Sequence, residues 1–169
     1  DLIRFENYAL LALSTLYGIE LLEDNVKECI LNLFITFHDF YKDFAAKFDR
    51  IPKNNVEESA KTIIVANIVQ GDFLKRISAD GKAIVFSEWA PIKLTKTTKQ
   101  IKVIRTEYTL REIFEKATIE PGTIYTPVPK TEQLSLFENQ DETPMLPVFK
   151  YLPVKITEVY MELREEASE

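Results

Sequence analysis

The chain has 169 residues, of which 46% are hydrophobic and 28% are charged, and its formal net charge is −6. This composition predicts a folded domain with a real core rather than a disordered segment. The negative charge argues against a dedicated nucleic-acid-binding domain, because neutralising phosphates requires clustered Lys and Arg. No apolar run reaches the roughly 18 to 20 residues that span a bilayer, so we expect a cytoplasmic protein without a membrane partner.

The first half of the chain is predicted to be helical. Apolar residues at roughly helical spacing predict a helix over residues 2–17, which Gly18 would stop. A longer helix is predicted over residues 25–48, with Asp24 as its cap, and a third helix over residues 56–69. The apolar stripe expected on the second helix consists of Val26, Ile30, Leu33, Phe37, Phe40, Tyr41 and Phe44.

The second half of the chain predicts a small antiparallel sheet with one short helix. Strands are expected over residues 83–89 and 101–108, joined by a loop rich in Lys and Thr. Thr109 and Glu112 fit a capping box, which predicts a short helix over residues 110–118. The residues expected to face inward from this helix are Leu110, Ile113, Phe114 and Ala117.

Residues 126–147 contain four prolines among polar residues, a composition that predicts an exposed linker. A strand interrupted by Pro153 is expected next, and Thr157 would cap a last helix over residues 158–166. The sequence therefore predicts an α+β fold with a helical N-terminal half of about three helices, a small sheet, an exposed linker and a C-terminal strand and helix. The expected division is an α+β domain over 1–125, the linker over 126–147, and a strand and helix over 148–169 that pack on the domain.

The residue types that support catalysis are scarce. One cysteine, Cys29, and one histidine, His38, exclude an internal disulfide and a zinc cluster of the Cys/His type. The four glycines are too widely separated for a phosphate-binding loop. The nuclease pattern of an acidic residue followed by Glu-x-Lys on a strand is incomplete, because Ala90 stands at the position of its lysine. We therefore expect no catalytic residue, metal ligand or cofactor in this chain.

The most specific feature of the sequence is the run Gln133, Leu134, Ser135, Leu136 and Phe137. It resembles the pentapeptide with which bacterial replication and repair proteins bind the DNA sliding clamp, in which Gln and Leu are followed by Ser or Asp, then Leu and Phe. All five positions match. The resemblance covers only these residues, and it implies a partner, the bacterial sliding clamp, rather than a fold or an activity.

The chemistry of the pentapeptide is consistent with that role. The adjacent Leu136 and Phe137 suit a concave apolar pocket on a partner, and Gln133 can both donate and accept hydrogen bonds at its rim. The alternative is that Leu134 and Leu136, which alternate along the chain, belong to a strand that packs on this domain's own core.

A local basic tract runs through residues 93–105 of this acidic chain. Its cations recur every third residue, with no acidic residue between them, and would contact the phosphates of DNA or RNA. The alternative is a solvated loop at the tip of a hairpin. The tract consists of Lys93, Lys96, Lys99, Lys102 and Arg105.

These features predict a non-catalytic interaction segment that tethers a larger bacterial or phage DNA-metabolism protein to the sliding clamp. The parent would act in repair, DNA modification and restriction, or a mobile element. Because the first residue is Asp, we expect the remainder of a larger parent chain. One alternative is a scaffold subunit of a nucleoprotein complex, similar to the small subunits of CRISPR effectors, that binds nucleic acid through the basic loop. Another is a structural domain of an enzyme whose active site lies outside this chain.

Overall fold

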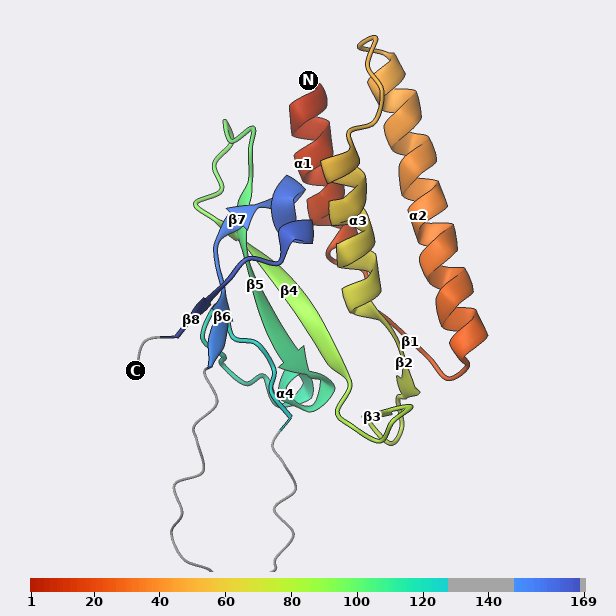
Figure 1. Ribbon diagram of the computed structural model, residues 1–169, viewed down its shortest axis with the longest axis vertical. Coiled ribbons are helices and arrows are strands. Elements are labelled where there is room, and N and C mark those ends of the chain that lie inside the picture. The colour runs from red at the N-terminus through yellow and green to blue at the C-terminus, as the bar shows by residue number, and fades with distance from the viewer. Residues whose placement is uncertain (128–147, 168–169) are drawn as a thin grey trace, which may run out of the picture.

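The computed structural model of the chain describes residues 1–127 and 148–167. Three helices stand side by side in the N-terminal half (Figure 1), and together with small sheets they confirm the predicted α+β class. The helices are α1 (Leu2–Leu13), α2 (Glu23–Ala46), α3 (Asn54–Asn67) and the short α4 (Leu110–Glu115), with a 3-10 helix, η1 (Ile156–Met161).

The strands form three small sheets. The first has the order β1-β2-β3, and its β1 and β2 are parallel, which the sequence did not predict. The second has the order β4-β5-β7 and is antiparallel, as expected for the central hairpin. The third pairs β6 with β8. The strands are β1 (Gly18–Glu20), β2 (Ile68–Asp72), β3 (Ile77–Ser78), β4 (Val85–Ile92), β5 (Lys102–Thr109), β6 (Phe149–Tyr151), β7 (Val154–Lys155) and β8 (Arg164–Glu166).

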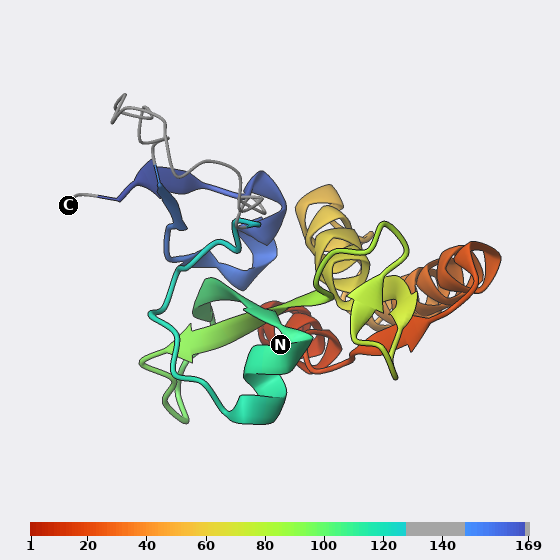
Figure 2. The ribbon, with the colours of Figure 1, turned by 90° about the horizontal axis from the view of Figure 1, so that it is seen from below.

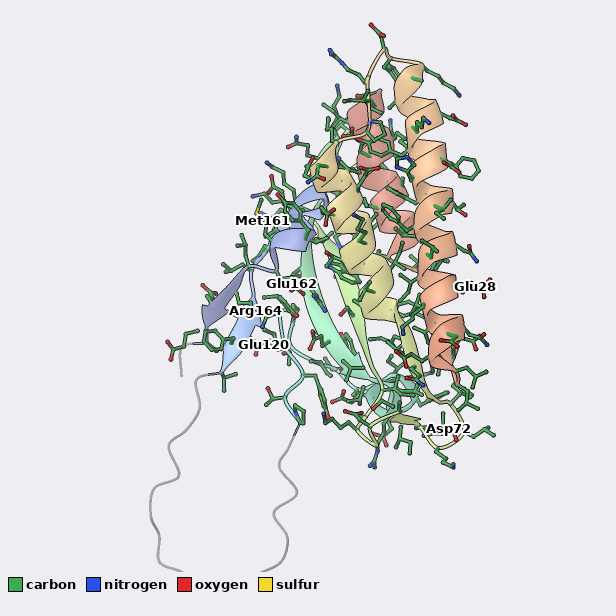
Figure 3. All side chains as sticks on the ribbon, turned by 45° about the vertical axis from the view of Figure 1, so that its right-hand side comes forward. Glu28, Asp72, Glu120, Met161, Glu162 and Arg164 are labelled. Carbon is green, nitrogen blue, oxygen red and sulfur yellow. The ribbon has the colours of Figure 1, made fainter. Side chains whose placement is uncertain are left out.

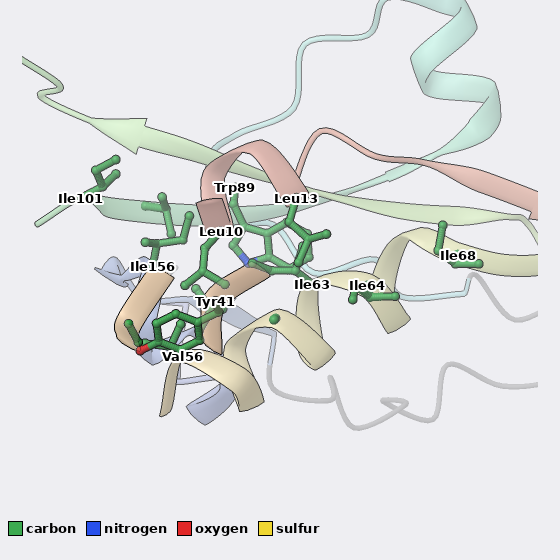
Figure 4. Close-up of a cluster of buried hydrophobic side chains, with 14 of the residues drawn as sticks. Leu10, Leu13, Tyr41, Val56, Ile63, Ile64, Ile68, Trp89, Ile101 and Ile156 are labelled. Carbon is green, nitrogen blue, oxygen red and sulfur yellow. The ribbon is translucent and has the colours of Figure 1, made fainter. Parts of the chain in front are cut away.

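The main core lies between the three long helices and one face of the β4–β5 hairpin (Figure 4). Trp89 of β4 is buried against Leu10 of α1 and Ile63 of α3. Ile156 of η1 is also fully buried in this cluster. The residues after 147 therefore pack on the N-terminal part, and β7 extends the hairpin sheet through β5.

A buried polar network ties the helices together. The Tyr41 hydroxyl of α2 donates to the Glu6 carboxylate of α1 at 2.7 Å and accepts from the Lys53 backbone N–H at 3.1 Å. The Lys53 ammonium pairs with the same carboxylate at 2.9 Å. Because Glu6 and Tyr41 are almost completely buried, these bonds replace water that the two side chains lose on folding.

The predicted helix over residues 2–17 is too long. Helix α1 ends at Leu13, and Gly18 begins β1 instead of stopping a helix. The hydroxyls of Ser14 and Thr15 donate back to the carbonyls of Leu11 and Ala12. Such local bonds compete with continuation of the helix and end it early.

The predicted helix caps are right at one position and wrong at another. Thr109 and Glu112 form both bonds of the capping box, as the sequence predicted. Asp24, however, does not cap α2, because the helix begins at Glu23 and its N-cap, Leu22, makes no side-chain bond. The carboxylates of the first turn stabilise the helix through its dipole instead.

Several residues expected to be buried are exposed. Phe40 is 70% exposed, because α2 turns only a narrow stripe containing Tyr41 toward the other helices. Ile113 and Phe114 are 45% and 50% exposed. Helix α4 ends at Glu115 since the next residue is left-handed, which leaves one turn with little surface to bury.

The predicted last helix over residues 158–166 is wrong. A 3-10 helix begins at Ile156, before the expected cap Thr157, and Glu162 takes a left-handed conformation that ends it. The chain then enters β8, which pairs with β6. This strand pairing across a wide sequence separation overrides the local helical preference.

Candidate functional site

An open groove of about 860 Å³ lies between β1 and the end of the β4–β5 hairpin that leads into α4. Seen from below, β1 and β2 lie side by side, with α4 across from them (Figure 2). Residues from both sheets meet beneath the groove, because Ile19 and Val69 pack against Phe86 and Leu110. The groove is lined mostly by aromatic and aliphatic side chains, with a few polar groups among them.

Tyr17 forms the wall next to β1. Its ring meets the buried Phe86 edge to face, with centroids 5.3 Å apart. Its hydroxyl donates to the Ser87 carbonyl at 3.4 Å. Partial burial, followed by the nearby charges of Glu88 and Tyr108, raises the pKa of Tyr17. The phenol therefore remains a hydrogen-bond donor across the neutral range.

The polar groups of the groove come from the hairpin and α4. Burial, and then the Glu88 carboxylate, raises the pKa of Tyr108. The Glu112 carboxylate is occupied by the capping box, where it accepts from the Thr109 N–H and hydroxyl, each at 2.7 Å. Glu88 forms no ion pair with any described residue, and a side-chain hydrogen bond with Tyr108 adds to the rise in the pKa of that phenol.

The carboxyl ends of the parallel strands adjoin this groove. Glu20 ends β1 directly after Ile19, and Asp72 ends β2 directly before Phe73, and both Ile19 and Phe73 line the groove. Asp72 lies near the lower end of the described part of the chain (Figure 3). Parallel strands place their carboxyl ends at one edge of a sheet, which is where ligands bind in doubly wound α/β sheets; here a single parallel pair has that geometry.

The two terminal carboxylates differ in availability. Asp72 accepts from the backbone N–H groups of Leu74 and Lys75 at 3.0 and 3.1 Å, and these bonds, mainly the one from Lys75, lower its pKa. Glu20 accepts only from the Asn25 side-chain amide, at 3.4 Å, among the described residues. Glu20 is therefore the terminal carboxylate that is freer to bind a ligand.

The pentapeptide over residues 133–137 lies outside the described residues. The basic tract is described, and it divides into two parts. Lys93, Lys96, Lys99 and Lys102 are exposed on the β4–β5 loop and the first residue of β5. Within this group, Lys99 lies 3.4 Å from the Asp1 carboxylate.

Arg105 does not belong to the exposed part of the tract. Its side chain is only 14% exposed and pairs with Glu162 at 2.6 Å and Glu107 at 3.2 Å. Its guanidinium lies 4.6 Å from the Tyr151 ring centroid and 5.3 Å from that of Trp89. No local pattern predicts this pairing, because Glu162, labelled in Figure 3, is far along the chain. Arg105 is part of a structural ion pair rather than a free cation.

No group of three His, Cys, Asp or Glu residues is placed to hold a metal ion within residues 1–127 and 148–167. His38 contacts Glu57 of α3, so its ring is occupied by a neighbouring helix. In the same described ranges, no helix combines the length and apolarity needed to cross a membrane.

The groove was not predicted from sequence. The residues that could have indicated it are Tyr17, Phe73 and Glu20, the acidic residue that ends the short strand β1. They come together only because β1 pairs with β2. No family model, curated protein or solved structure matches this chain. Its function must therefore be inferred from its own residues.

Proposed function

We propose that this chain is a segment of a larger bacterial or phage DNA-metabolism protein, and that Gln133–Phe137 tethers the parent to the DNA sliding clamp. The observation that carries the proposal is the match at all five positions of the clamp-binding pentapeptide. The parent would act in repair, in DNA modification and restriction, or in a mobile element.

The tether works through local concentration rather than chemistry. Leu136 and Phe137 fill the apolar pocket of the clamp, and Gln133 bonds at its rim. A short peptide must become ordered on binding, so the isolated contact is weak, with a dissociation constant on the order of micromolar. A clamp with several pockets, or a parent that also holds DNA, raises the effective affinity.

Displacement of a labelled clamp-binding peptide from a purified bacterial clamp tests the tether. The full chain should displace the peptide, whereas Gln133→Ala and the double variant Leu136→Ala/Phe137→Ala should not. Ser135→Asp is the matched control, because the pattern accepts Asp there and displacement should persist. Equal displacement by the double variant and the unmodified chain would contradict the tether.

A second candidate function is favoured by the parallel pair β1–β2 and the groove beside it. We propose that these residues form a nucleoside-binding site of a larger enzyme whose catalytic residues lie outside this chain. The acidic residue at the end of a parallel strand is the usual partner of ribose hydroxyls in nucleotide-binding sheets. Glu20 occupies that position, and Tyr17 and Phe73, each about half exposed, offer rings on which a base stacks.

Calorimetric titration of the full chain with adenosine, guanosine, cytidine and uridine tests the nucleoside site. The preferred ribonucleoside should bind more tightly than its 2′,3′-dideoxy analogue, because the Glu20 carboxylate accepts from the ribose hydroxyls. Glu20→Gln should remove this preference. Glu23→Gln is the control, since Glu23 pairs with Lys27 on the helix surface. A preference that survives Glu20→Gln, or the absence of binding by all four nucleosides, would rule this site out.

A further inference from the structure

A second hollow, of about 580 Å³, lies on the side of α4 away from the groove, beside the turn between β3 and β4. Its lining holds four cations and, among the described residues, one carboxylate, that of Glu115. Asp72 and Asp80 pair with Lys75 and Lys82 beside the hollow, so the described charges leave an excess of one cation, in a chain whose net charge is −6. The cations come from three separate segments and are Lys75, Arg76, Lys82 and Arg111.

We propose that this hollow binds phosphate groups of a nucleic-acid backbone. Concave surfaces lined by cations concentrate anions, and phosphate oxygens accept hydrogen bonds from several cations at once. None of the four cations belongs to the pentapeptide, to the exposed lysines of residues 93–102 or to the lining of the nucleoside groove. The site therefore does not depend on either proposal for the function of the chain.

Arg76 is the central residue of the proposed site. Its guanidinium carbon lies 4.6 Å from the ring centroid of Phe114, and Phe114 in turn lies beside Phe73, with ring centroids 6.0 Å apart. Stacking on an aromatic face holds the planar guanidinium while leaving its N–H edges open to a phosphate. Arg76 forms no ion pair with any described residue. An anion can therefore bind Arg76 without breaking an existing ion pair.

The other three cations pair with nearby carboxylates in positions where the pairing is weak. Lys82 pairs with Asp80 at 2.6 Å, Lys75 with Asp72 at 3.3 Å, and Arg111 with Glu115 at 2.8 Å. The three cationic side chains are between 63% and 77% exposed. Exposed pairs of this kind contribute little to stability because water and salt screen them. A phosphate can therefore share or replace these partners at little cost.

The turn between β3 and β4 leaves the hollow open to a large ligand. Gly81 adopts φ of +78°, which favours glycine, and a Cβ atom added there would meet nothing within 4 Å. The backbone is thus uncovered at the mouth of the hollow, next to Lys82. A polymer backbone can approach without displacing a side chain, which favours nucleic acid over a small enclosed phosphate.

Fluorescence anisotropy of a short labelled DNA duplex, measured with the full chain at several salt concentrations, tests the site. Arg76→Gln/Lys82→Gln should weaken binding roughly tenfold and reduce the salt slope by about 0.9 for each phosphate that is no longer neutralised. The control is Lys27→Gln/Lys61→Gln, which removes the same charge from α2 and α3. Lys61 is also stacked on a ring, at 4.9 Å from the Phe34 centroid, but unlike Arg76 it pairs with a carboxylate, that of Glu58, at 2.7 Å.

A second arm titrates pyrophosphate in place of DNA. Duplex binding that weakens roughly tenfold in Arg76→Gln/Lys82→Gln and is retained in the control supports the nucleic-acid site. Variant-sensitive binding of pyrophosphate without binding of the duplex would overturn the nucleic-acid assignment in favour of a free phosphate ligand. Equal weakening in variant and control, or no binding of either ligand, would overturn the site, and thermal unfolding of each variant shows that it is folded.

Discussion

The side-chain amide of Asn67 forms two hydrogen bonds with the backbone of Ser87. The Ser87 N–H donates to Asn67 Oδ1 at 2.8 Å, and Asn67 Nδ2 donates to the Ser87 carbonyl at 2.9 Å. Asn67 is the last residue of α3 and directly precedes β2, whereas Ser87 lies on the free edge of β4. This pair of bonds therefore sets the position of the parallel strands against the hairpin, and with it the groove.

Replacing Asn67 by Ala should destabilise the fold strongly. The change leaves the N–H of the buried Ser87 without a partner, at about 1 to 3 kcal/mol for an unsatisfied group. The Ser87 carbonyl loses its 2.9 Å bond and keeps only the 3.4 Å bond from the Tyr17 hydroxyl. We expect a loss of about 3 kcal/mol in the free energy of unfolding, measured by urea denaturation. Asn32→Ala, on the exposed side of α2, should change it by less than about 0.5 kcal/mol. A loss at Asn67 no larger than that control would contradict the assigned role.

Stability should fall in the alkaline range because of buried tyrosines. Burial, followed by the hydrogen bond to Glu6, raises the pKa of Tyr41 above its ordinary value of 10.0. Burial is also the largest cause that raises the pKa of Tyr151. The folded state then holds these protons more tightly than the unfolded state. The stabilisation is complete below the unfolded pKa and is lost as the pH rises from about 10 toward the folded pKa.

Denaturant unfolding across the alkaline range measures this effect. The unmodified chain should lose stability more steeply above pH 10 than Tyr41→Phe/Tyr151→Phe, which has no phenol to ionise at these positions. The double variant should be less stable at neutral pH, because the hydroxyls that donate to Glu6 and Glu107 are absent. Parallel pH profiles for the two proteins would show that these tyrosines do not cause the decline.

Arg105 should behave as a structural residue. Arg105→Lys keeps the charge but loses the planar group that spans Glu107, Glu162 and the ring of Tyr151. We expect a loss of about 2 kcal/mol in the free energy of unfolding. Arg111→Lys is the matched change, because Arg111 forms a solvent-exposed pair with Glu115 that contributes little. A similar small effect at both positions would contradict the structural role.

Neutralising the four loop lysines to Gln should leave stability within about 0.5 kcal/mol of the unmodified chain, because their side chains are exposed. The quadruple variant therefore tests the nucleic-acid scaffold alternative without a folding defect. Salt-dependent binding of single-stranded nucleic acid that disappears in this variant would support that alternative. Binding that persists would exclude the loop as the contact. The four residues are Lys93, Lys96, Lys99 and Lys102.

The features that sequence patterns predict correctly are local ones. The three long helices, the break before α3, the β4–β5 hairpin and the capping box of Thr109 and Glu112 all follow from residues close together in the chain. Helical spacing, turn residues and cap chemistry act over a few residues, so pattern alone predicts them. The clamp-binding match at residues 133–137 is also readable from sequence alone, and it remains a prediction.

Tertiary structure decided the features that depend on residues far apart. Gly18 lies in a strand because β1 pairs with β2, about fifty residues later in the register Gly18↔Ile68. Arg105 is neutralised by Glu162, and Arg76 is oriented by Phe114, through interactions that no local pattern encodes. Burial and charge pairing depend on which segments meet in space. Local sequence patterns therefore do not predict the groove or the cationic hollow. They also do not predict that Arg105 of the basic tract is held in an ion pair.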